Sequence, residues 1–169
     1  AMYLDCGNIL EAHGYRQYEI SNYARPGRAC IHNCGYWLGK DYLGLGPSAV
    51  STLNGRRWSQ PADLETWSTA VTHGDLYENA DILSLREQQE ELIMLRLRMT
   101  DGLPLDEYYR RTGRDLIVDD ASLTEPLVHE GLAVLEKNRF RLTRKGMLLS
   151  NSIIEAFFER LDLPGTKNA

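Results

Sequence analysis

The sequence has few cysteines and no long apolar segment. Only three cysteines occur among 169 residues, and so small and odd a number excludes a secreted disulfide scaffold. No apolar run is long enough to cross a bilayer, and the first residues lack the charged and apolar regions of a signal peptide. These absences predict a cytoplasmic protein with no integral membrane segment.

The chain also lacks an excess of basic residues. Lys and Arg total 19 against 24 for Asp and Glu, which gives a net charge of -5. A negative chain has no general attraction for nucleic acid or an anionic membrane, so any basic site must be local. The hydrophobic content of 43% is enough to bury a core, and the length fits one domain or two small ones.

The first half of the sequence predicts an α/β pattern. Helical spacing over residues 2–13 ends at Gly14, a favoured residue just past a helix. The aromatic segment 15–24 predicts a strand that leads into a loop. The apolar run in residues 42–51 predicts a buried strand that ends in a glycine-rich turn.

A hairpin and a short helix are predicted next. Asn54 and Gly55 form the commonest two-residue hairpin signal, between possible strands in residues 52–58. Residues 63–72 predict a short helix that ends at Gly74.

The second half opens with two predicted helices. Ser84 and Glu87 form a capping box, and the apolar residues after them recur at helical spacing until Gly102. A second helix follows Pro104 and ends at Gly113.

A third helix and a hairpin complete the pattern. Ser122 and Glu125 form another capping box, and the helix that they begin ends at Gly131. Short apolar strands in residues 132–142 predict a hairpin, after which Thr143 caps a long last helix. Helices, a hairpin and a final helix are typical of a winged-helix-like module.

The densest group of metal-capable side chains is Cys30, His32 and Cys34. A CxxxCxxC cluster motif would need a cysteine where Trp37 stands, and Cys6 is distant in sequence. A structural role for the thiols is therefore favoured over metal binding.

Residues 18–51, YEISNYARPGRACIHNCGYWLGKDYLGLGPSAVS, carry a specific resemblance. The segment resembles the oxygen-independent coproporphyrinogen III oxidase-like radical S-adenosylmethionine (SAM) family, and in particular its haem chaperone branch. The HNxxYW part, at residues 32–37, is similar to the signature that separates this branch from the true oxidases. The resemblance continues through residues 96–102 and 141–146, so it covers nearly the whole chain.

The resemblance implies a carboxy-terminal fragment of a longer parent. Family members bind a [4Fe-4S] cluster through an amino-terminal CxxxCxxC motif in a partial TIM-type barrel, and they use SAM. That motif is absent from this sequence. We therefore expect an α+β chain: an incomplete piece of a radical SAM α/β barrel over residues 1–75, then a helical winged-helix-like domain over residues 84–163. We expect it to retain no cofactor and not to be an enzyme by itself.

Haem binding is the function that the resemblance implies for His32, Tyr36 and Trp37. Imidazole is a common axial ligand of haem iron, and the two aromatic rings could pack against a porphyrin. The alternative is that His32 is a loop residue whose imidazole is bonded to nearby backbone.

The resemblance also implies that Gly44, Gly46 and Pro47 lie beside the SAM pocket, where backbone without Cβ can approach a ligand closely. The alternative is a strand-ending turn that serves only folding. The sequence departs from the family at Val50, where a histidine is common, so no role is assigned to that histidine. Cys34 stands at a variable position and receives no family function.

Nucleic-acid binding is a rival of a different class for the winged-helix-like module. The helix before its hairpin, residues 122–130, has two glutamates and no Lys or Arg, which argues against docking in a DNA groove. The hairpin region carries a basic cluster, for which a solvated face is favoured. The cluster comprises Lys137, Arg139, Arg141, Arg144 and Lys145.

The hypothesis is therefore a protein of porphyrin or haem metabolism whose parent binds haem and delivers it to an acceptor protein. The alternative is a true coproporphyrinogen III dehydrogenase, and the second alternative is a winged-helix module that binds nucleic acid or protein. We expect no nucleic-acid partner. An incomplete barrel would expose a sheet edge and apolar surface, so self-association is expected.

Overall fold

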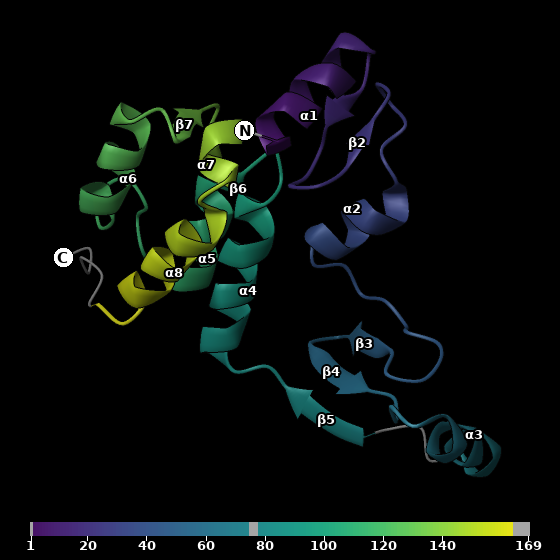
Figure 1. Cartoon of the computed structure of the whole chain (residues 1–169). Helices are drawn as coiled ribbons and strands as arrows, with labels where there is room; N and C mark the ends of the chain where they lie inside the picture. The colour runs from purple at the N-terminus through teal and green to yellow at the C-terminus, as the bar shows by residue number, and fades with distance from the viewer. Residues whose placement is uncertain (1, 75–77, 164–169) are drawn as a thin grey trace.

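The computed structural model describes residues 2–74 and 78–163, and Figure 1 shows the first half running along one side of the helical second half. Its helices are α1 Met2–Ala12, α2 Ile31–Trp37, α3 Leu64–His73, α4 Leu85–Leu97, α5 Leu105–Thr112, α6 Ala121–His129, α7 Arg144–Met147 and α8 Ser150–Arg160. Its strands are β1 Arg16–Gln17, β2 Tyr23–Ala24, β3 Val50–Leu53, β4 Arg56–Ser59, β5 Glu78–Ile82, β6 Leu103–Pro104, β7 Ala133–Glu136 and β8 Arg139–Leu142.

The segment 15–24 forms a tight hairpin, so the prediction of a single strand is wrong. β1 and β2 pair antiparallel, and the Tyr18 N–H donates to the Asn22 carbonyl at 3.1 Å across the loop. Glu19, in this loop, pairs with Met99 in an isolated antiparallel bridge. The composition of the segment could not reveal this turn, because the loop pairs with Met99, which lies far along the chain.

Residues 31–37, expected in a loop, form the helix α2. The Cys34 N–H donates to the Cys30 carbonyl at 2.9 Å, and the Leu38 N–H donates to the Cys34 carbonyl at 2.9 Å. Gly39, with φ of 65°, follows the helix in the left-handed region. The helix is only 7 residues long, so it shows too little periodicity to be recognised from sequence.

The apolar run after α2 is not a buried strand, which corrects the prediction for residues 42–51. Within the run, Tyr42 makes an isolated antiparallel bridge with Thr52. Leu43 and Leu45 are 63% and 92% exposed. Gly46 has φ of 111°, which turns the backbone away from the extended path of a strand.

The sheet of β3, β4 and β5 begins with the predicted hairpin. Asn54 and Gly55 have φ of 52° and 76°, as a two-residue hairpin turn with positive φ at both positions requires. The predicted helix α3 follows: the Asp63 carboxylate accepts the Thr66 N–H at 2.8 Å, and Gly74 ends the helix in the left-handed conformation. Both predictions are confirmed.

α4 begins with the predicted capping box. The Glu87 N–H donates to the Ser84 hydroxyl at 3.2 Å, and the Ser84 N–H donates to the Glu87 carboxylate at 2.7 Å. The helix ends before the predicted Gly102, because the chain leaves it to meet the β1–β2 loop. There the Thr100 N–H donates to the Tyr18 carbonyl at 3.2 Å.

α6 does not start with the capping box predicted at Ser122. Asp120 occupies the N-cap position, but its buried carboxylate accepts the Tyr108 hydroxyl at 2.7 Å and the Arg114 guanidinium at 2.7 Å. Burial, and then the hydrogen bond to Asp120, raise the pKa of Tyr108. The capping prediction is wrong because the N-cap lies two residues earlier, at Asp120, whose carboxylate is held by Tyr108 and Arg114.

The last sheet has the strand order β6-β8-β7, and its short edge strand β6 was not predicted. The predicted hairpin of β7 and β8 turns at Lys137 and Asn138, both with positive φ. The predicted long last helix is two helices. The Thr143 hydroxyl caps α7 by accepting the Gly146 N–H at 3.1 Å, and a turn from the Leu149 N–H to the Gly146 carbonyl then precedes α8.

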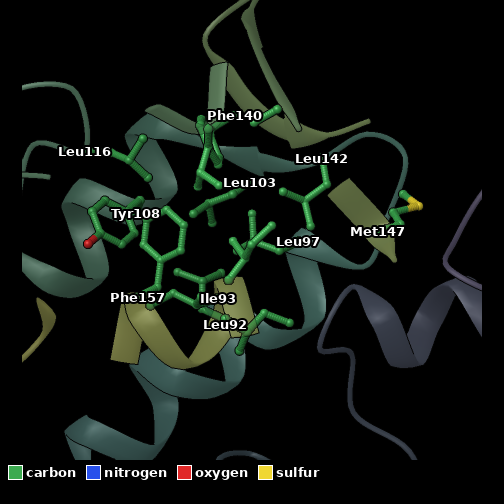
Figure 2. Close-up of a cluster of buried hydrophobic side chains, with 14 residues drawn as sticks. Leu92, Ile93, Leu97, Leu103, Tyr108, Leu116, Phe140, Leu142, Met147 and Phe157 are labelled. Atoms are coloured by element: carbon green, nitrogen blue, oxygen red, sulfur yellow. The ribbon is translucent and has the colours of Figure 1, made fainter. Parts of the chain in front are cut away.

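One cluster of buried hydrophobic side chains holds the second half together (Figure 2). α4 contributes Leu92, Ile93 and Leu97, and Phe140 of β8 meets Phe157 of α8 with ring centroids 5.8 Å apart. Among the described residues, all the hydrophobic side chains of this buried core lie between Leu92 and Phe157.

The mixed helix and sheet content confirms the predicted α+β class. The division into residues 1–75 and 84–163 stays a prediction, and residues 75–77 of the expected boundary lie outside the described ranges.

Candidate functional site

α2 places His32 and Tyr36 on one face of the helix, because residues four apart are neighbours there. Their ring centroids are 4.6 Å apart, with the planes at 74°. The His32 side chain is exposed and makes no hydrogen bond within the described ranges. The alternative of an imidazole bonded to nearby backbone is therefore not what the structure has.

Tyr42 extends this aromatic pair to three rings. Its ring centroid lies 4.4 Å from that of Tyr36, at 80°. Two backbone hydrogen bonds fix Tyr42 against Thr52, at 2.8 Å and 3.0 Å. Sequence reasoning did not assign Tyr42 to the site, because the helix motif stops short of it and only the fold brings the two segments together.

Trp37 lies apart from His32 and Tyr36. It lines a different cavity, of about 300 Å³, together with residues of α4 that include Leu92 and Arg96. Its carbonyl lies 3.5 Å from the Arg96 guanidinium, and its buried indole N–H has no hydrogen-bond partner in the described part of the chain. The structure thus brings together two of the three residues expected to contact haem.

The loop of Gly44, Gly46 and Pro47 is shaped by close backbone contact. A Cβ on Gly44 would lie 2.2 Å from the Val50 carbonyl oxygen, so that position needs glycine. The Gly44 N–H donates to the Ser51 hydroxyl at 3.0 Å. Gly46 has open space around its α-carbon. The loop is therefore held by its own contacts.

His32 and Tyr36 share a shallow, open hollow of about 520 Å³ with Gly44. α2 and β3 lie on the same side of the molecule in Figure 1, and the loop between them supplies part of the lining of the hollow. Of the residues expected at a haem site and at a SAM-side loop, the hollow brings together His32, Tyr36 and Gly44, whereas Gly46 and Pro47 do not line it. Its lining comprises His32, Tyr36, Tyr42, Leu43, Gly44, Leu45, Ala49 and Val50.

The three cysteines are free thiols, with Cys6 and Cys30 exposed and Cys34 half-buried. Within residues 2–74 and 78–163, no group of three or more His, Cys, Asp or Glu side chains is arranged to hold a metal ion. In the same ranges, no helix is long and apolar enough to cross a membrane.

The basic cluster near the last hairpin is engaged in contacts within the chain. Arg141 forms an ion pair with Glu136 at 2.8 Å. Arg144 donates to Asn8 at 3.1 Å and pairs with Glu11, both on α1. Two of the five basic side chains, Arg141 and Arg144, are thus paired with partners within the chain.

Comparisons with known proteins agree with the motif. Residues 83–149 match the family model described as the HemN C-terminal domain. The chain is 32% identical to the heme chaperone HemW of Bacillus subtilis over 90% of this chain and 40% of that protein. It is 31% identical to HemW of Escherichia coli over 88% of this chain and 39% of that protein.

A solved structure shows the same fold. The coproporphyrinogen III oxidase HemN from Escherichia coli, titled a radical SAM enzyme, matches with a TM-score of 0.68 at 18% identity. The match covers 91% of this chain and 39% of that chain. The chain thus spans about 40% of the length of these curated relatives. The predicted resemblance, including the haem chaperone branch, is confirmed.

Proposed function

Because residues 83–149 belong to the HemN C-terminal domain family and the chain is related to heme chaperones, we propose that it is part of a protein that binds haem and delivers it to an acceptor. The observation that carries the proposal is the exposed imidazole of His32, edge-on to Tyr36 in an open hollow. A neutral imidazole is a common ligand of haem iron.

His32 acts as the iron ligand in this proposal, and Tyr36 flanks the ligand. The edge-to-face contact between the two rings limits how far the imidazole can rotate. Trp37 takes no part in the same hollow, because it lines the other cavity together with residues of α4. Haem delivery is preferred over oxidation of coproporphyrinogen because the HNxxYW pattern is complete at residues 32–37.

A [4Fe-4S] cluster does not fit the residues of this chain. Its three cysteines are free thiols, and in the described ranges no group of three or more His, Cys, Asp or Glu side chains could hold a metal ion. SAM fits the loop only in part. The Gly44 N–H is already bonded to Ser51, whereas a Cβ on Gly46 would meet no atom within 4 Å and Pro47 is exposed. A SAM-side role is proposed for these last two residues alone.

We also propose the finer architecture. The order α4, β6, α5 and α6, followed by the hairpin of β7 and β8 and then by α7 and α8, supports a winged-helix-like module. The exposed leucines of the first half support the end of a barrel with a further layer or partner over it. An acceptor protein and a second copy of the chain are both candidates to cover this surface.

Titration of haemin into the purified chain tests the function. The wild-type chain is expected to bind haemin with a Soret band typical of imidazole ligation. His32→Ala should weaken binding by more than about tenfold and shift the band, since the iron loses its ligand.

His129→Ala is the matched control, because His129 is 86% exposed on α6, in the other half of the chain. It should leave the affinity and the spectrum unchanged. An identical spectrum and affinity in His32→Ala and the wild type would refute the ligand assignment.

A further inference from the structure

Two leucines of the loop after α2 stand out by their exposure. Leu45 is 92% exposed and Leu43 is 63% exposed, and both line the hollow beside His32. A single exposed leucine is ordinary on a protein surface. Here they adjoin Tyr36 and Val50, which are also exposed, so apolar surface gathers at one spot, as at ligand sites.

The loop is fixed in this exposed arrangement. Tyr42 is bonded twice to Thr52, at 2.8 Å and 3.0 Å. The Gly44 N–H is bonded to Ser51, which is 1% exposed, and the Gln60 N–H donates to the Ala49 carbonyl at 2.8 Å. Turning the leucines inward would break these bonds. The hollow is therefore formed before a ligand arrives, which lowers the entropic cost of binding.

The side chains that line the hollow indicate which kind of ligand it can bind. None of the residues around the hollow is Asp, Glu, Lys or Arg, so a charged peptide or a phosphate finds no partner there. The polar side-chain groups are one imidazole and the hydroxyls of two tyrosines. A volume of about 520 Å³ lies within the roughly 300–1,000 Å³ usual for small-molecule sites. A porphyrin with a metal at its centre fits this lining when its charged propionates point out of the open hollow into solvent.

We propose that Leu45 and Tyr42 form the wall that contacts the porphyrin ring while His32 holds its iron. This proposal rests on the haem-binding function above and adds residues to it. The iron ligand stands on α2, whereas the wall comes from the loop that follows, so the two parts of the site can be altered separately. Leu45 contributes affinity by burying its side chain on binding, and it has no effect on the iron spectrum.

Haemin titration of Leu45→Ser tests the wall. Because Leu45 is almost fully exposed, its replacement should leave the fold intact. The haemin Kd should rise about tenfold, with the Soret band unmoved, since His32 still binds the iron. Leu64→Ser is the matched control: Leu64 is 67% exposed on α3 and does not line the hollow, so the Kd should not change.

The outcomes distinguish the proposed wall of Leu45 and Tyr42 from the proposed haem-binding function on which it rests. If His32→Ala impairs binding and Leu45→Ser behaves like Leu64→Ser, the wall is overturned and haem binding stands. If the wild-type chain binds no haemin, or binds it equally without His32, both proposals fail. If Leu45→Ser changes only the sedimentation of the free chain, the leucine contacts a second copy, and the wall is again overturned.

Discussion

The two halves of the chain are built differently. From α4 onward, buried hydrophobic side chains from helices and strands meet in one core. In the described residues before α4, no hydrophobic side chain belongs to that buried core, and the structure depends on caps, tight turns and backbone bonds. Burial therefore stabilises the second half, whereas the first half leaves several large apolar side chains exposed.

Within the first half, α1 and the β1–β2 hairpin contact the core of the second half. The Tyr3 hydroxyl donates to the Ile20 carbonyl at 2.8 Å, and both side chains pack against the core cluster. Glu19 meets Met99 in a backbone bridge. In the part of the chain that is described, no side chain of the loop with Leu45 packs against the core cluster. The candidate site thus lies on the less anchored portion.

The largest expected contrast is in stability. Phe157 is fully buried against Phe140, so Phe157→Ala should lower the free energy of unfolding by about 3–5 kcal/mol. Leu53→Ala, at a side chain 39% exposed on β3, should lower it by less than about 1 kcal/mol. Urea unfolding followed by circular dichroism measures both. Equal losses would show that the first half has a core of its own.

A smaller contrast should appear at high pH. The pKa of Tyr108 is raised by burial and by its bond to Asp120, so the folded state favours the neutral phenol. The contribution to stability is present below the ordinary tyrosine pKa of about 10, and it is lost as the pH rises above that value. The free energy of unfolding should fall there by up to about 1.4 kcal/mol per pH unit.

Tyr108→Phe isolates this effect, because other groups titrate equally in the variant and the wild type. The variant should lose stability less steeply above about pH 10 than the wild type in parallel urea titrations. Parallel curves would mean that Tyr108 does not govern the alkaline loss of stability in the second half.

The sequence predicted features that are decided locally. Ser84 with Glu87, and Asn54 with Gly55, specify a helix start and a turn through neighbouring atoms, and both are present. The sequence wrongly predicted a buried strand for the loop with Leu45. Burial depends on which other segments cover a residue, and the composition of the loop does not indicate that.

The candidate site was predictable to a similar extent. The motif identified His32 and Tyr36, which the helix places together. It also suggested Trp37, which the same helix turns toward α4. Tyr42 could not be assigned, since its contact with Tyr36 depends on a backbone bridge to β3 that no local pattern reveals.

Hydrogen exchange followed by mass spectrometry, with and without haemin, tests the central claim most directly. Haemin should slow amide exchange in residues 31–50 of the wild-type chain and leave residues 92–157 unchanged, because ligand binding is assigned to the first half and the core to the second. His32→Ala should abolish the added protection. Haemin-dependent protection confined to residues 92–157, or none in residues 31–50, would contradict the claim.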